Sequence, residues 1–279
     1  MPDELRGEEY DSKSDSEMTL NSYRDYFQQQ GRLTVDSSLH LTACQRSNRS
    51  DKVAMFVQEL LDCNIGKAKE LYEQFKDKYQ IYLTRDVEKA KSKLRARKDQ
   101  LIDRGYIDGI DYEEIRIGML MSSKASRLRP LGYEIKKVAD YLSKVPNWFL
   151  DPSDNIGSSN FLEIALNEFF VQGLELDLAA IMWDADFRYN KEKNDWDYYE
   201  FNRNKWSPVD QDTSTQVIKQ FYMKNAYRVL LTRSRVGMVI VVPKGSQYNE
   251  NGSLLDSTRN PQFYDDTYEY LKSLGLNVI

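Results

Sequence analysis

The sequence predicts an α/β fold built on a mainly parallel sheet. Short apolar runs that indicate buried strands recur along the 279-residue chain, and longer segments with helical spacing of apolar residues separate them. This alternation is typical of strand–helix–strand units, whose helices cover both faces of a parallel sheet. The chain is also long enough for one large domain or two modest ones with a sizeable core.

The expected elements follow one another from residue 33. The first part of the chain predicts an extended segment and two helices, at 33–44, 49–61 and 66–79. A short buried strand at 80–84 leads into a long basic helix at 85–105, which Gly105 ends. Further strands are expected at 115–123, 162–169, 178–184, 236–243 and 276–279, and further helices at 213–235 and 261–275.

Three segments lack both periodic patterns. Residues 124–132 form a basic loop with a Pro/Gly stop, and residues 145–160 form a connection rich in Pro, Gly, Ser and Asn. The polar and aromatic stretch at 189–208 predicts a surface insertion or a β-hairpin. We therefore expect one domain over residues 22–279, with an insertion around 188–210.

The charge is distributed unevenly. Residues 1–20 hold seven acids against Arg6 and Lys13, so this stretch alone carries the whole formal net charge of −5. An acidic, Ser-rich terminus cannot bury enough apolar surface to fold, so a disordered acidic tail is expected over residues 1–21. The remaining residues are formally neutral, and the acidic pI therefore does not exclude a polyanionic partner.

Several function classes are disfavoured by composition. Cys44 and Cys63 form neither a disulfide framework nor a metal-ligand spacing, and the single histidine, His40, argues against a His-rich zinc site or a Ser-His-Asp triad. No apolar run approaches the roughly 18 residues that a membrane span needs. The start of the chain is acidic, whereas a secretory signal has a basic start. We therefore expect a cytoplasmic protein.

Polar clusters beside predicted strands are candidate ligand sites, because ligands of open α/β sheets bind at the carboxyl ends of strands or in the loops leading into helices. In QGLELD (172–177), Gly173 allows close backbone approach, Gln172 can reach a phosphate and Glu175 can accept from ribose hydroxyls. The alternative is that Gly-Leu-Glu forms a plain turn.

Two further clusters supply arginine, whose planar fork donates two parallel bonds to phosphate and stays charged. YRVLLTRSR (227–235) contains Arg228, Arg233 and Arg235 just before a predicted strand, and ACQRSNRS (43–50) contains Arg46 and Arg49. Arginines near a helix end also complement the helix dipole or pair with surface acids, which is the alternative explanation.

The three clusters together resemble the motifs of superfamily 1 helicases of the UvrD/Rep kind. VQGLELD is similar to motif V, YRVLLTRSR to motif VI and LTACQRSNRS to motif IV. A longer series of blocks, including IYLTRD, GMLMSSKASRLRP, WFLDP, SSNFLE and WDADFRY, resembles the domain of unknown function 2075 family, a Schlafen group 3-like DNA/RNA helicase domain.

The resemblance implies the second RecA-like domain of a helicase or nucleic-acid-dependent ATPase, a three-layer sandwich of the P-loop NTPase type. ATP with Mg²⁺ would lie between this domain and a first RecA-like domain that carries the P-loop. By position, Arg233 is implied as the arginine finger and Arg46 as its motif IV partner. Four residues are implied as the nucleotide edge, namely Gln172, Gly173, Glu175 and Arg235.

The sequence departs from a complete ATPase. It contains no G-x-x-x-x-G-K-[ST] motif, so we expect a C-terminal half of a motor that does not hydrolyse ATP alone. Gln45 stands where the UvrD kind has an aromatic before its motif IV arginine, and Glu168-Phe169-Phe170 replaces the usual opening of motif V.

A motor of this type needs a DNA or RNA track. Basic clusters at 88–98 and at Lys124, Arg127 and Arg129 are candidate phosphate contacts, with a solvated helix face as the alternative for the first. Aromatic residues such as Trp183 either stack bases or belong to the core. Two other functions stay open: a non-catalytic nucleic-acid or protein-binding module of the same fold, and a nuclease accessory based on Asp184 and Asp186.

Overall fold

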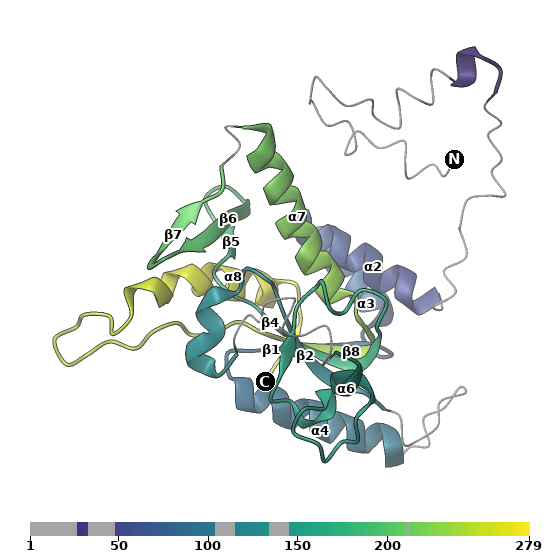
Figure 1. Cartoon of the computed structure of the whole chain (residues 1–279), viewed down its shortest axis with the longest axis horizontal. Coiled ribbons are helices and arrows are strands. Elements are labelled where there is room, and N and C mark those ends of the chain that lie inside the picture. The colour runs from purple at the N-terminus through teal and green to yellow at the C-terminus, as the bar shows by residue number, and fades with distance from the viewer. Residues whose placement is uncertain (1–26, 33–47, 104–114, 134–144, 211–212) are drawn as a thin grey trace.

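The computed structural model describes residues 27–32, 48–103, 115–133, 145–210 and 213–279 (Figure 1). Its centre is a six-stranded sheet of order β3-β2-β4-β8-β1-β9, in which every neighbouring pair is parallel. The strands are β1 (Gln80–Thr84), β2 (Ile117–Met121), β3 (Ala165–Leu166), β4 (Leu176–Met182), β8 (Ser234–Val241) and β9 (Asn277–Val278). The predicted α/β class with a parallel sheet is therefore confirmed.

Helices cover both faces of the sheet, which makes a three-layer sandwich of the RecA-like kind (Figure 1). One face packs against α4 (Val87–Asp103), which contacts β1, β2, β4 and β8. The other face packs against α2 (Asn48–Leu61), α3 (Ile65–Phe75), α7 (Ser214–Leu231) and α8 (Gln262–Ser273).

Strand β4 shows why the sequence folds in this way. All seven of its residues are buried, and their side chains alternate between the two faces. Ala179 and Ile181 join the core under α2, α3, α7 and α8, whereas Leu178, Ala180 and Met182 join the core against α4. A strand buried on both faces is a near-continuous apolar run, which is the pattern that predicted it.

A second, antiparallel sheet stands beside the N-terminal half of α7 (Figure 1). It consists of β5 (Phe187–Asn190), β6 (Asp195–Asn202) and β7 (Lys205–Pro208), so hairpins form over the stretch where a hairpin or insertion was expected. Stacked aromatic rings join this sheet to the main core: the ring centroid of Trp183, just after β4, lies 5.8 Å from that of Phe187 and 5.4 Å from that of Trp196. Trp183 is 1% exposed and is therefore a core residue.

Two segments expected to be irregular contain helical turns. A 3₁₀ helix, η5 (Ser126–Leu131), replaces the basic loop after β2. The Pro-rich connection holds α6 (Val145–Leu150) and a 3₁₀ turn, η6 (Ser159–Phe161). Trp148 explains α6, because its ring is buried and its Nε1 donates to the carbonyl of Ile164 at 3.1 Å. A last 3₁₀ turn, η7 (Ser257–Arg259), precedes α8.

Two segments expected near the start of the chain cannot be compared with the structure. The acidic tail at 1–21 and the extended segment at 33–44 lie outside the described residues. Within the described ranges, no helix combines the length and the apolarity that crossing a bilayer requires.

Gly237 gives a direct test of the packing of β8 between β1 and β4. A Cβ added at Gly237 would lie 2.7 Å from the carbonyl oxygen of Gln80, a backbone atom held in the β1 ladder. We expect Gly237→Ala to lower the free energy of unfolding by roughly 1–3 kcal/mol in urea denaturation, as overpacking in a rigid core does. Gly66→Ala is the matched control, because nothing lies within 4 Å of its added Cβ and α3 favours Ala over Gly. Equal stability of Gly237→Ala and the parent would contradict the described register.

Candidate functional site

The segments 172–177 and 233–235 meet at the amino ends of neighbouring strands. The backbone N–H of Leu176 donates to the carbonyl of Arg233 at 2.9 Å, and Leu176 pairs with Ser234 in the β4–β8 register. Gly173 turns the chain before β4 with a φ of 85°, a left-handed conformation that favours glycine. Gln172 and Gly173 are exposed on this turn, and Glu175 is half-buried.

This position corrects one expectation. We expected the 172–177 and 227–235 clusters at the carboxyl ends of strands or in loops leading into helices, but both lie in loops that lead into strands. The physical reason is the chain order. The segment after Gly173 enters β4 directly, and α7 ends at Leu231, two residues before Arg233 and just ahead of β8.

The two arginines of this segment differ in their surroundings. Arg233 follows the last turn of α7, and its Nε donates to the carbonyl of Val229 at 3.1 Å. Arg235 is exposed, and its Nη2 lies 2.7 Å from Oδ1 of Asp177, which is itself 2% exposed. Asp177 also accepts from the backbone N–H of Arg116 at 2.7 Å, so a second hydrogen bond besides the contact with Arg235 holds its carboxylate in place. Arg46, the third predicted arginine, lies outside the described residues.

The carboxyl edge of the sheet holds a second polar group. Asp186 is completely buried and accepts from the Ser122 hydroxyl and the Tyr227 hydroxyl, each at 2.8 Å. Asp184 is 1% exposed and accepts from the Tyr264 hydroxyl at 2.9 Å and from the Arg127 backbone N–H at 2.7 Å. These are the two carboxylates considered as a metal pair, and within the described ranges no group of three His, Cys, Asp or Glu side chains could hold a metal ion.

Burial sets the protonation of this acid pair. It raises the pKa of Asp186 to about 8, and the neighbouring Asp184 carboxylate adds to the shift. Burial also raises the pKa of Asp184. The nearby Arg188 guanidinium, 8% exposed and 3.8 Å from the centre of the Phe263 ring, has its pKa lowered to about 10 by burial.

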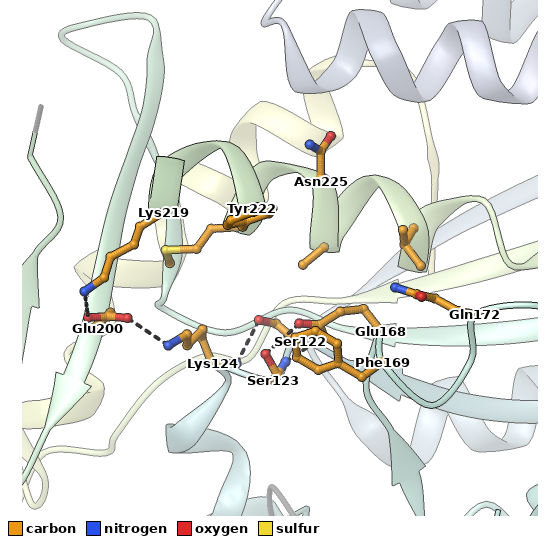
Figure 2. Close-up of a pocket in the computed structure, with 13 residues that line it drawn as sticks. Ser122, Ser123, Lys124, Glu168, Phe169, Gln172, Glu200, Lys219, Tyr222 and Asn225 are labelled. Carbon is orange, nitrogen blue, oxygen red and sulfur yellow. Dashed lines mark hydrogen bonds and ion pairs between the residues drawn. The ribbon is translucent and has the colours of Figure 1, made fainter. Parts of the chain in front are cut away.

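A cavity of about 440 Å³ opens beside this group (Figure 2). Its walls come from the loops after β2 and β3, from β6 and from α7. At one end, Glu200 of β6 receives Lys124 Nζ at 2.8 Å and Lys219 Nζ at 3.2 Å. The Lys124 ammonium holds the pKa of Glu200 below its usual value, so the carboxylate is ionised at neutral pH.

The floor of the cavity is acidic and ordered. Glu168 is 6% exposed, and its two carboxylate oxygens accept from the backbone N–H of Ser123 at 2.8 Å and from the Ser123 hydroxyl at 2.6 Å. Phe169, next in sequence, is 61% exposed, and Tyr222 of α7 is 66% exposed. Gln172 reaches this cavity as well, so the residues expected at the nucleotide edge span two neighbouring surfaces.

The predicted phosphate contacts are placed differently from one another. Lys124 lies at the cavity, as described above, whereas Arg127 is largely buried, with Nη2 2.5 Å from Asp256 and its guanidinium 5.1 Å from the centre of the Phe201 ring. Arg129 is exposed on η5. The geometry therefore gives Arg127 an ion pair with Asp256, and Lys124 lines the cavity described above.

The basic helix α4 has many of its charges engaged. Lys91 is 6% exposed and lies 2.9 Å from Glu163, and Lys93 lies 4.2 Å from the centre of the Tyr82 ring. Arg95 donates to the carbonyl of Phe161 at 3.1 Å. These contacts hold three cationic side chains against neighbouring parts of the domain, which differs from the fully solvated face that was the alternative.

The sequence alone did not identify the cavity. Glu200, Lys219 and Tyr222 carry no motif, and they meet Lys124 only because the β5–β7 sheet folds against α7. The sequence offered one signal, which is that Glu168 and Phe169 replace the residues with which motif V of superfamily 1 helicases usually opens.

Comparisons with known proteins identify the family. The model of the Schlafen group 3, DNA/RNA helicase domain family matches residues 4–244, and no curated protein matches the sequence. A crystal structure of the C-terminal domain of a possible DNA helicase from Lactobacillus plantarum WCFS1 shares 13% identity over 80% of this chain and 98% of that chain. Its TM-score of 0.29 is too low to establish a common fold. Because the family model spans most of its length, the chain belongs to the Schlafen group 3 DNA/RNA helicase domain family.

Proposed function

We propose that this helicase-related domain is the second RecA-like half of a superfamily 1-like, nucleic-acid-dependent ATPase. The observation that carries the proposal is the meeting of Gln172–Glu175 and Arg233 at the same end of the adjacent strands β4 and β8, tied by the 2.9 Å bond from Leu176 to Arg233. The stretch 172–175 resembles part of motif V of such ATPases, and the segment that contains Arg233 resembles their motif VI.

In this proposal Arg233 supplies fixed positive charge to the γ-phosphate of ATP. In phosphoryl transfer the protein mainly positions the reacting groups and stabilises the charge on the transferring group. An arginine can stabilise this charge without gaining or losing a proton. Arg233 is proposed for the γ-phosphate because it holds the position that resembles the motif VI arginine, and Arg235 pairs with Asp177 in this structure. Arg46 is proposed as its partner.

The other nucleotide contacts come from the turn before β4. Gly173 keeps this turn open to close approach, since nothing lies within 4 Å of the position a Cβ would take. Glu175 is proposed to accept from the ribose hydroxyls, and Gln172 to reach a phosphate or its water. ATP and Mg²⁺ would be held chiefly by a P-loop domain, because this sequence contains no such loop.

A DNA or RNA track is proposed from the family and from the cationic residues at the carboxyl edge. Of the three predicted contacts, Lys124 and Arg129 are exposed or half-exposed. Phosphate contacts of this kind give affinity that falls with salt and does not depend on base sequence.

Reconstitution tests this function. The P-loop domain encoded with this chain, in the same or a neighbouring reading frame, is assayed for ATP hydrolysis alone and mixed with this chain, with and without single-stranded DNA or RNA. We expect turnover only in the mixture, stimulated by nucleic acid. Hydrolysis by this chain alone would contradict the half-site assignment. Nucleic-acid binding without any stimulation of the partner would favour the non-catalytic binding module instead.

A further inference from the structure

The cavity between the β2 and β3 loops and α7 has the size and the walls of a small-molecule site. Its volume of about 440 Å³ lies within the roughly 300–1,000 Å³ typical of ligand pockets. Figure 2 shows Tyr222 on α7 along one wall and Phe169 on the opposite wall. Both rings are more than half exposed, so their faces are accessible to a ligand in the cavity.

The charges at one end of the cavity are arranged as in an anion site. One carboxylate, that of Glu200, lies between two ammonium groups that approach it from α7 and from the loop after β2 (Figure 2). A phosphodiester carries the same single charge on two terminal oxygens. The side chains of Lys124 and Lys219 are each 47% exposed, so both remain accessible from solvent.

We propose that this cavity binds one nucleotide of a single strand, with the base between Phe169 and Tyr222 and the phosphate between Lys124 and Lys219. Glu200 then occupies the phosphate position in the unbound protein, so its side chain makes an autoinhibitory contact that the nucleic acid displaces while β6 stays paired with β5 and β7. This inference rests on the nucleic-acid partner of the proposed function but not on ATP or on Arg233.

The remaining polar groups of the cavity fit a base edge. Glu168 uses one hydrogen bond on each carboxylate oxygen, and each oxygen has a further lone pair for an exocyclic amine or a ribose hydroxyl. The Gln172 amide supplies both a donor and an acceptor at the wall.

Fluorescence anisotropy of labelled, unstructured single-stranded DNA and RNA oligonucleotides, with the full chain and no nucleotide, tests the proposal. Glu200→Gln removes the competing charge, so it is expected to tighten binding by roughly 3- to 10-fold. Tyr222→Ala and Phe169→Ala are each expected to weaken binding by roughly 5- to 100-fold, the range for loss of one stacked base. Lys219→Gln is expected to reduce the slope of log K against log salt by about 0.7.

Matched controls separate the cavity from general effects. Asp197→Asn removes the carboxylate of another lysine pair on the same strand, with Lys193 at 2.6 Å, and Tyr248→Ala removes an exposed tyrosine elsewhere. Both are expected to leave affinity unchanged, and a thermal unfolding curve of each variant checks that it is folded.

The outcomes are decisive in either direction. Equal or weaker binding by Glu200→Gln, wild-type affinity in both aromatic variants, or no binding by any variant at low salt would overturn the proposal. Cavity-dependent binding together with a failed reconstitution of ATP hydrolysis would contradict the proposed ATPase function alone.

Discussion

Arg233→Ala is expected to lower kcat of the reconstituted ATPase by about 10³- to 10⁵-fold, the range for loss of an arginine finger. The reason is that the transferring phosphoryl group would lose a positive charge placed for the transition state, while binding of ATP depends mainly on the P-loop domain. Arg233→Lys is expected to restore little activity, because an ammonium does not reproduce the planar fork that the 3.1 Å bond to Val229 orients.

The measurement is single-turnover and steady-state ATP hydrolysis in the presence of single-stranded nucleic acid. Arg228→Ala is the matched control, since Arg228 lies in the last turn of α7, five residues before Arg233, and donates to Asn225. Near-normal turnover in Arg233→Ala, with Arg228→Ala unchanged, would remove Arg233 from the catalytic role.

The contribution of Asp186 to the free energy of unfolding is expected to decrease as pH rises. The pKa of its carboxyl is about 8 in the folded protein and 3.8 without the fold, so the folded state binds the additional proton between these values. Because the pKa of Asp186 is raised in the folded state, its contribution to the free energy of unfolding is complete below about pH 4. That contribution is lost as pH rises through about 8. Around pH 5–8 the slope for one proton is on the order of 1 kcal/mol per pH unit.

Urea denaturation at several pH values measures this slope. Asp186→Asn keeps the shape and lets the amide donate to the Ser122 or Tyr227 hydroxyl, so it is expected to flatten the pH dependence and to exceed the parent in stability near pH 8. The groups that face Asp186 are neutral hydroxyls, the acids Asp184 and Glu168, and Arg188. Asp99→Asn, an exposed substitution on α4, serves as the control. A parallel pH profile in Asp186→Asn and the parent would contradict the assignment.

The fold could be predicted from the sequence wherever burial imposes a local pattern. Strand β1 begins and ends where the QIYLT run does, and β4 follows from a run that is apolar on both faces. The helix α6 could not be predicted in the same way, because it depends on the burial of Trp148 against a segment that follows it in sequence. Local composition there favours a loop, and tertiary packing overrides it.

The same distinction applies to the candidate site. Gln172, Gly173, Glu175 and Arg233 were predicted together, and the adjacency of β4 and β8 places them at one end of the sheet. The lysine pair around Glu200 joins residues 124, 200 and 219, which no short motif connects. Sequence spacing carries no information about such a contact until the position of the second sheet is known.

Helix α7 connects the two surfaces described above. Its residues from Lys219 to Val229 form one wall of the cavity, and the chain leaves its last turn directly into Arg233. Eighteen residues of α-helix span about 27 Å as a nearly rigid rod. Tyr222 and Leu231 lie nine residues apart on this helix, so the rod holds the cavity wall at a fixed distance of about 14 Å from the start of the segment that carries Arg233.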